Sequence, residues 1–406
     1  MPTPTPEKRT TVQVLALGFT QTIAWASSTY LIAILARPIA HDLNVSASTV
    51  FGAFSIALVV MALTGPMAGR AIDRWGGRDV LVLSNVVLAT GLALLGAAAS
   101  PVALFVGWSV IGAGMALGLY DAAFATLVRL HAGAARGPIT GITLIAGFAS
   151  TVGWPLTAFI AEHYGWRASC FAWAGLHVLV ALPVNLLCIP VVARRAGAAH
   201  ASGAIDAVAE AEPPFRWDGA KKRAFALLVV FAATTSFVTS AMAAHLPGLL
   251  VAVGTTALAA LTAGALLGPA QVAARLLEFL AARRFKFHPL LSARLAAACH
   301  PVGGMLLGLF GGPPLVASVF AVLHGAGNGM ITIAKGTLPL AIFGAVGYGH
   351  RQGLLGVLGR GMQALAPFAF GWVLERHGAS AGITLSMTLS LIALVALMML
   401  RMNEQP

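Results

Sequence analysis

Uninterrupted apolar runs of about 20 residues or more recur along the whole chain, separated by short polar segments. A helix of about 20 apolar residues crosses a hydrocarbon layer roughly 30 Å thick. Hydrophobic residues make up 58% of the 406 residues, more apolar surface than a water-soluble domain can cover. Barrel strands would instead appear as short segments of alternating polarity. The sequence therefore predicts an all-α membrane protein.

The apolar runs predict about twelve membrane-spanning helices. The first run follows directly on "MPTPTPEKRT" and is too long to be the core of a cleavable signal peptide. The predicted spans lie near 11–36, 47–68, 79–99, 102–128, 138–161, 168–192, 225–250, 257–281, 291–311, 314–341, 353–374 and 381–401.

The basic residues indicate the orientation. If the N-terminus is cytoplasmic, nearly all Lys and Arg residues outside the spans fall on the cytoplasmic side, and only Arg37, Arg167 and Arg376 fall outside. This positive-inside pattern predicts that both termini are cytoplasmic. The net charge of +12 therefore reflects membrane topology and does not indicate a nucleic-acid partner. The Ala- and Gly-rich chain with its minimal loops favours a bacterial inner membrane.

One long polar segment, 194–223, divides the predicted spans six and six. It is rich in Ala, Gly, Pro and charge, which is typical of a linker. We therefore expect two six-helix bundles. The predicted parts are a tail at 1–10, bundles at 11–192 and 225–402, a linker at 193–224 and a tail at 403–406.

The two predicted bundles repeat short motifs at matching positions. The fourth span contains "IGAG" from Ile111, and the tenth contains "HGAG" from His324. The fifth and eleventh spans end in "EHYG" (162–165) and "ERHG" (375–378). Two pseudo-symmetric six-helix bundles are the architecture of transporters that expose a central site alternately to each side of the membrane.

The loop between the second and third spans reads "GRAIDRWGGRD" and contains Asp73, Arg74 and Arg78. It resembles the signature of the major facilitator superfamily, G-x-L-x-D-R-x-G-R-R/K. It departs from that signature at Ala71, where leucine is usual, and at Gly77, where a basic residue is usual. The resemblance implies the major facilitator fold, a secondary transporter driven by an ion gradient, with protons expected first, and a gating role for Asp73 with its neighbouring arginines.

In the eighth span, Gln271, Arg275 and Glu278 lie on one helical face. This arrangement resembles the D-x-x-x-R pattern of monocarboxylate transporters, with Gln271 in place of the aspartate. The resemblance implies that Arg275 holds a substrate carboxylate with its fork of donors. Because an amide cannot titrate, the coupling proton must be carried elsewhere. The alternative is an Arg275–Glu278 ion pair that only stabilises the bundle.

In the tenth span, His324, Asn328 and Thr332 are spaced by four and form a stripe that ends near Lys335. Spans one, four, seven and ten line the central cavity in the superfamily that the chain resembles. We therefore expect the stripe to face that cavity, with His324 as a candidate proton carrier because an unperturbed imidazole titrates near pH 6.5. The alternative is hydrogen bonding between helices, worth about 1 kcal/mol or less per bond.

Aligning "IGAG" with "HGAG" brings Asp121 and Lys335 to nearly the same depth. They are therefore predicted to form an ion pair that closes the cytoplasmic gate. The alternative is a lysine that extends to the membrane surface and an aspartate bonded within its own bundle. Tyr30 and Tyr120 complete the candidate substrate contacts.

The charged residues inside the spans are mainly basic in the second bundle, which favours an organic anion as the small-molecule substrate. One alternative is efflux of hydrophobic or cationic compounds, for which Asp121 and the aromatic residues are the candidate contacts. A second alternative is a non-transporting sensor on the same fold.

The sequence contains no P-loop, G-x-S-x-G or metal-spaced His/Cys motif. We therefore expect no enzymatic activity, cofactor or metal. We also expect a monomer in the lipid bilayer.

Overall fold

The computed structural model describes residues 6–131, 136–191, 218–285, 289–343 and 348–400. Within these ranges the chain is helical and contains no strand, which confirms the predicted all-α class. The N-terminal helices are α1 (Pro6–Ser27), α2 (Leu31–Asp42), α3 (Ala47–Trp75), α4 (Gly77–Gly96), α5 (Pro101–Gly118), α6 (Tyr120–His131), α7 (Arg136–Ala146), α8 (Ala149–Leu176) and α9 (Leu182–Cys188). The C-terminal helices are α11 (Gly219–Ala252), α12 (Ala257–Ala265), α13 (Leu267–Phe285), α14 (Pro289–Phe310), α15 (Pro314–Phe343) and α16 (Tyr348–Met399).

Ten helical segments of the described chain are long and apolar enough to cross a membrane. Two of them, Gly137–Cys188 and Leu355–Met399, have 52 and 45 residues, about twice what one crossing needs. Each changes direction at a glycine with a positive φ, 85° at Gly165 and 78° at Gly378. Each segment is thus long enough for two crossings. The first covers the predicted spans five and six, and the second covers the predicted spans eleven and twelve.

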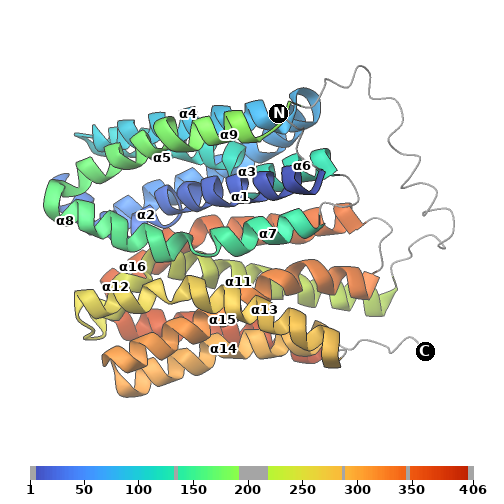
Figure 1. The fold of residues 1–406 in the computed structure, drawn as a ribbon. Helices are drawn as coiled ribbons and strands as arrows, with labels where there is room; N and C mark the ends of the chain where they lie inside the picture. The colour runs from blue at the N-terminus through green and yellow to red at the C-terminus, as the bar shows by residue number, and fades with distance from the viewer. Residues whose placement is uncertain (1–5, 132–135, 192–217, 286–288, 344–347, 401–406) are drawn as a thin grey trace.

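The N-terminal helices α1–α9 lie together as one half, and the helices α11–α16 form the other (Figure 1). Most of the predicted linker falls in 192–217, outside the described residues. The described chain begins at Pro6 and finishes at Leu400 at the same end of the molecule (Figure 1). We call the opposite end, which contains Asp42, Gly165 and Gly378, the distal end.

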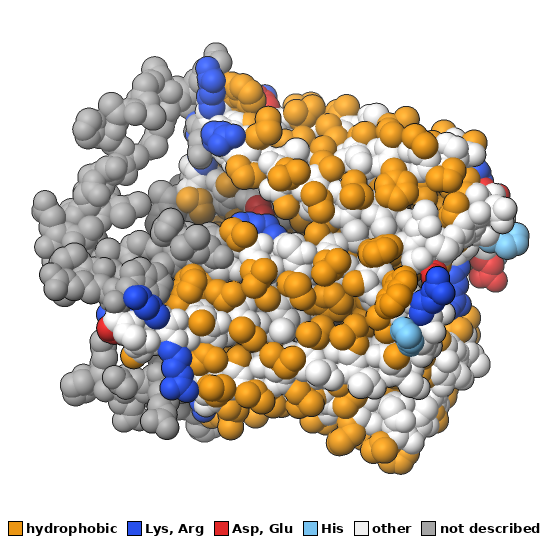
Figure 2. Space-filling view, turned by 180° about the vertical axis from the view of Figure 1, so that it is seen from behind, with side chains coloured by type: hydrophobic (Ala, Val, Ile, Leu, Met, Phe, Trp, Pro, Cys, Tyr) orange, Lys and Arg blue, Asp and Glu red, His pale blue; other side chains and the backbone are white. Residues whose placement is uncertain are grey.

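The surface has the polarity expected of a protein in a bilayer. Hydrophobic side chains extend over the lateral face, and charged side chains gather mostly toward its two ends (Figure 2). Leu63 and Leu179, for example, are 72% and 76% exposed. Such extensive apolar exposure matches contact with lipid.

The repeated "GAG" motifs make equivalent helix contacts in the two halves. A Cβ atom at Gly112 would lie 2.2 Å from the carbonyl oxygen of Ala57, so α5 touches the backbone of α3. A Cβ atom at Gly325 would lie 2.7 Å from the carbonyl oxygen of Leu267, so α15 touches the start of α13 in the same way. Gly114 brings α5 against α4, and Gly327 brings α15 against α14. Small residues let membrane helices approach closely, and here they do so at matching positions.

The turn predicted in "GRAIDRWGGRD" is confirmed. Helix α3 ends at Trp75, Gly76 adopts a φ of 97°, and α4 begins at Gly77. A Cβ atom at Gly77 would lie 2.1 Å from Oγ1 of Thr126 in α6. This close approach explains why position 77 does not carry the basic residue of the signature.

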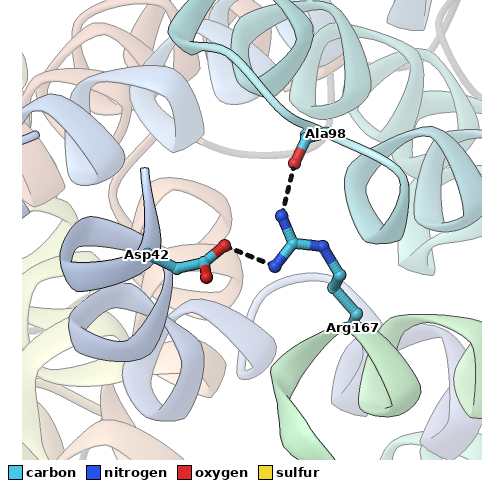
Figure 3. A network of polar contacts seen from close by, with 3 residues as sticks. All are labelled: Asp42, Ala98 and Arg167. Carbon is cyan, nitrogen blue, oxygen red and sulfur yellow. Dashed lines mark hydrogen bonds and ion pairs between the residues drawn. The ribbon is translucent and has the colours of Figure 1, made fainter. Parts of the chain in front are cut away.

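At the distal end, three segments of the N-terminal half are joined by one arginine (Figure 3). Arg167 in α8 forms an ion pair with Asp42 at the end of α2. It also donates a hydrogen bond of 2.9 Å to the carbonyl oxygen of Ala98, after α4. These contacts hold the distal ends of three helices together within the N-terminal half.

Candidate functional site

Arg275 lies where the two halves meet. Its Nη1 donates to the carbonyl oxygen of Thr143 in α7, at 3.2 Å. Its Nε donates to the carbonyl oxygen of Gly329 in α15, at 3.3 Å. The half-buried guanidinium also lies near Tyr30 and Tyr120. The structure thus brings together one C-terminal and two N-terminal residues that the sequence predicts as substrate contacts.

Both tyrosines lie at breaks in the N-terminal helices. Tyr30 stands between α1 and α2, and Tyr120 begins α6 directly after the break at Leu119. At each break, a backbone carbonyl oxygen accepts a hydrogen bond from a side chain of another helix. Trp154 donates from Nε1 to the carbonyl oxygen of Tyr30 at 3.0 Å, and Gln21 donates from Nε2 to that of Gly118 at 2.5 Å. Non-helical backbone at membrane depth is tolerated only where protein or a cavity surrounds it.

Aromatic rings surround the two tyrosines. The ring centroids of Trp25 and Tyr120 are 5.0 Å apart, and Trp154 meets Tyr30 edge-on at 5.5 Å. Phe124 stacks on Tyr120 at 5.2 Å. We call these five residues the aromatic group. Its rings and the nearby guanidinium combine an apolar surface with a positive charge.

The other two residues predicted on the face of Arg275 have different roles. Gln271 is buried, and its backbone packs so closely on Gly329 that a Cβ there would lie 2.7 Å from its carbonyl oxygen. Glu278 lies near Ser292 of α14. Among the described residues Glu278 forms no ion pair with Arg275, so the alternative of a purely structural pair is not seen in this structure.

His324 does not face the space between the halves, which corrects the expectation that it lines the central cavity. Its Nδ1 lies 2.7 Å from Nδ1 of His300 in α14, and both histidines are buried inside the C-terminal half. The ring of His324 also stacks on Phe320 of its own helix. His300 is not among the residues predicted from the sequence, although an ionisable residue inside a predicted span is a functional candidate in itself.

The rest of the predicted stripe on α15 also makes helix contacts. Thr239 in α11 donates from Oγ1 to Oδ1 of Asn328 at 2.8 Å. Thr332 donates to the backbone carbonyl of Asn328, one turn earlier on its own helix. For Asn328, the alternative of hydrogen bonding between helices therefore describes the observed contact, whereas the exposed Thr332 bonds only within its own helix.

Lys335 lies in a small cavity between α11, α15 and α16. Its Nζ donates to Oγ of Ser236 at 2.9 Å. The cavity, of about 140 Å³, is also lined by Arg360 and Gln363, and no acidic side chain is among its described lining residues. Asp121 is exposed in α6 and forms no ion pair with Lys335 in this structure. The ion pair between them stays a prediction for another conformation.

The gating residues predicted in the α3–α4 turn are described only in part. The side chain of Asp73 lies outside the described part of the structure. Arg74 is exposed at the end of α3, and Arg78 pairs with Asp79 at 3.0 Å.

A cavity of about 770 Å³ lies between the halves at the distal end, and we call it the distal cavity. It is formed by α2, α3, α8, α11, α12 and α16. Its titratable lining residues are Arg37, Glu162, His245 and Glu375. Within the described residues, no group of three or more His, Cys, Asp or Glu side chains is arranged to hold a metal ion.

Comparison with known proteins gives a family and a set of similar folds. The profile described as Major Facilitator Superfamily matches residues 17–367. A bacterial homologue of the human lysosomal transporter Spinster, in an inward-facing and unoccupied conformation, is 16% identical over 98% of this chain and 96% of that chain, with a TM-score of 0.67. A D-xylose-proton symporter is 16% identical over 96% of each chain, with a TM-score of 0.72. The nucleoside transporter NupG is 13% identical over 96% of this chain and 98% of that one, also with a TM-score of 0.72.

Proposed function

The chain belongs to the major facilitator superfamily, and we propose that it is a secondary transporter of a small organic anion, driven by an ion gradient. The family and the fold identify an integral membrane transport protein and not an enzyme. The substrate class, the coupling ion and the membrane are the proposed part. We assign twelve crossings in two six-helix bundles, with the distal end outside a bacterial inner membrane and both termini in the cytoplasm.

The observation that carries the proposal is the position of Arg275 between the halves, beside Tyr30 and Tyr120. Two of its donor groups are held by backbone carbonyls, which fixes the plane of the guanidinium. Its Nη2 donates to no described residue and is therefore available to a ligand. A charge-assisted hydrogen bond from Nη2 can hold one oxygen of a transported carboxylate, while the charge of the guanidinium attracts the whole group.

The aromatic group supports an anion with an apolar body. Trp25, Phe124 and the two tyrosine rings give it flat apolar surfaces on the N-terminal side. A substrate held at one end by Arg275 and covered by these rings contacts both halves at once. Such a bridging ligand stabilises conformations in which the halves are close, which is what alternating access requires.

The charge of the C-terminal half also supports an anion. Lys335 and Arg360 line one cavity together with the neutral polar side chains of Ser236 and Gln363. This basic cavity lies between helices of the same half that holds Arg275. A cavity lined by basic groups favours anions over cations by simple electrostatics.

For proton coupling we propose the pair of His300 and His324. A hydrogen bond between two neutral Nδ1 atoms needs one ring that is protonated at Nδ1, and the Nε2 of that ring is then free to accept a proton. The Nε2 of His300 is buried and has no hydrogen-bond partner among the described residues. The pair can therefore take up one proton and keep its hydrogen bond. Asp121 and Glu278 are the other candidates for this role.

The proposal is tested by ligand-dependent stability followed by transport. Aliphatic and aromatic carboxylates are compared with organic cations of matched size for their effect on the melting temperature of the purified protein, because a ligand of the native state stabilises it. The compounds that bind are then tested for uptake and counterflow in proteoliposomes. Stabilisation by cations alone would favour the efflux alternative, and anion binding without any flux would indicate a sensor.

A further inference from the structure

The glutamates of the repeated motifs, Glu162 in "EHYG" and Glu375 in "ERHG", have no part in the proposed substrate site. Each lies three residues before a glycine with a positive φ, Gly165 or Gly378, where the long helices α8 and α16 change direction at the distal end. The two glutamates therefore occupy equivalent positions in the two halves. Both line the distal cavity.

Glu375 joins the two halves. Its Oε1 accepts a hydrogen bond of 2.6 Å from the backbone N–H of Ser48, the second residue of α3. The N–H groups of a first helical turn have no acceptor within the helix and carry partial positive charge. A carboxylate at this place is stabilised by the hydrogen bond and by the helix dipole together.

Next to this contact, α3 packs directly against α16 and α11 of the C-terminal half. The backbone N–H of Phe368 in α16 donates to Oγ of Ser55 in α3 at 3.2 Å. The rings of Phe51 in α3 and His245 in α11 have centroids 3.8 Å apart. Glu375 thus stands at the distal end of a continuous contact between the C-terminal half and α3.

The N-terminus of α12 has the same design as that of α3. Thr256 caps α12 as Ser46 caps α3, in each case by accepting a hydrogen bond from the backbone N–H three residues later. Leu258 is therefore the counterpart of Ser48, and its N–H also has no acceptor within its helix. Leu258 and Glu162 line the same distal cavity, yet no hydrogen bond joins them in the described structure.

We infer that Glu375 and Glu162 are paired latches of a gate at the distal end. Each carboxylate closes one half onto the first turn of a helix in the other half, Glu375 onto α3 and Glu162 onto α12. The first latch is formed in this structure and the second is open. The distal cavity is the space that the second latch closes. This device goes beyond the proposed function, because it concerns the balance of conformations and holds for any substrate.

The first latch is tested by access of a thiol reagent to Ala244, which lines the distal cavity and is 1% exposed. Ala244→Cys is introduced into a chain whose Cys170, Cys188 and Cys299 are replaced by alanine. The rate of maleimide labelling is measured in nanodiscs. The rate reports opening of the distal end and does not depend on knowing the substrate.

Ser48→Pro removes the N–H donor and is compatible with the first turn of a helix. It is expected to raise the labelling rate ~10-fold, as for loss of one hydrogen bond to a charged group. Glu375→Gln is expected to act in the same direction and less strongly. Ser48→Ala keeps the N–H and is the matched control, expected to label like the parent. The double variant, Ser48→Pro with Glu375→Gln, is expected to label no faster than Ser48→Pro alone, because both substitutions remove the same hydrogen bond. Labelling of Ser48→Pro at the rate of Ser48→Ala would overturn the first latch.

The second latch is tested by cross-linking in the same cysteine-free chain. Glu162→Cys with Leu258→Cys is expected to form a disulfide under mild oxidation, because closure brings these two positions together. A control pair, Glu162→Cys with Leu309→Cys, places the second thiol at an exposed position of α14 and is expected to remain unlinked. Equal yields for the two pairs, or no cross-link at all, would overturn the second latch. Melting temperatures close to that of the parent confirm that each variant is folded.

Discussion

Nη1 of Arg275 in α13 donates a hydrogen bond of 3.2 Å to the carbonyl oxygen of Thr143 in α7, and this contact joins the two halves. The same guanidinium is held by the carbonyl oxygen of Gly329 through Nε. Two backbone oxygens on different helices therefore orient one fork of donors between the halves. A lysine cannot reproduce this geometry, because its ammonium is a point charge on a flexible stem.

We expect Arg275→Lys to lower anion transport by about 10- to 100-fold, the range for losing one or two hydrogen bonds of a charged group. Uptake in proteoliposomes at matched protein density measures this. Arg294→Lys is the control, because Arg294 bonds to carbonyl oxygens of Leu397 and Leu400 within the C-terminal half. Wild-type transport by Arg275→Lys would make that arginine a structural residue.

We expect the double variant His300→Gln with His324→Gln to keep substrate exchange and to lose its acceleration by a pH gradient. Two glutamines can still hydrogen-bond to each other, but neither can take up a proton. Exchange and gradient-driven uptake are measured on the same vesicles, with His163→Gln at an exposed position of α8 as the control. An unchanged pH response would move the proton to Glu278 or Asp121.

We expect Tyr120→Phe to weaken substrate binding by about 5-fold, the effect of one neutral hydrogen bond. Tyr120→Leu is expected to weaken it further, because it also removes the ring that packs between Trp25 and Phe124. Apparent affinity is measured by competition in uptake. Tyr164→Phe, at a side chain that is 72% exposed, is the control. Equal affinities for all three variants would remove the aromatic group from the substrate site.

We expect neutralisation of Asp121 or Lys335 to favour the conformation that is open toward the cytoplasm, if the two form an ion pair when that side is closed. An interaction of about 1–3 kcal/mol is enough to shift the balance of two such states. Labelling of a cysteine on the cytoplasmic side measures the shift. Exchanging the two charges is expected to restore part of it, and a swap no better than either single variant would contradict the gate.

We expect Gly112→Ala to destabilise the protein by about 1–3 kcal/mol, because the added methyl would overlap the backbone of Ala57. Gly65→Ala is the control, since a Cβ there would have no atom within 4 Å. That substitution is expected to leave stability unchanged or to raise it, because alanine favours the helix. Melting in detergent compares the two variants, and equal melting temperatures would mean that α3 and α5 can separate at little cost.

Several parts of the fold could be predicted from the sequence alone. Long apolar runs require helices in a bilayer, because every backbone polar group must find a partner within its own segment. The glycines of "IGAG" and "HGAG" predict a repeat, and their packing against α3 and α13 is equivalent. The turn at Gly76 follows from a local signature that needs no tertiary context.

The site could be predicted only in part. Arg275 stands out because a charge deep in a span needs a partner, and its partners are indeed polar. The break at Tyr30 could not be predicted, since no proline or glycine lies next to it, and the single Gly118 before Tyr120 is no sufficient signal because glycine is frequent in membrane helices. Both breaks depend on Trp154 and Gln21, which come from other helices and donate hydrogen bonds to the backbone carbonyls at the two breaks.

The direction in which each span faces was decided by the tertiary structure. His324 and Asn328 share a face by periodicity, but periodicity does not say which neighbour covers that face. Only packing against α14 and α11 turned it toward His300 and Thr239. In a soluble helix, polarity separates an inner from an outer face, whereas a membrane helix is apolar all round and leaves its orientation to its neighbours. The sequence by itself therefore determined the class of protein and its repeat, and the packing of the helices decided which polar groups meet.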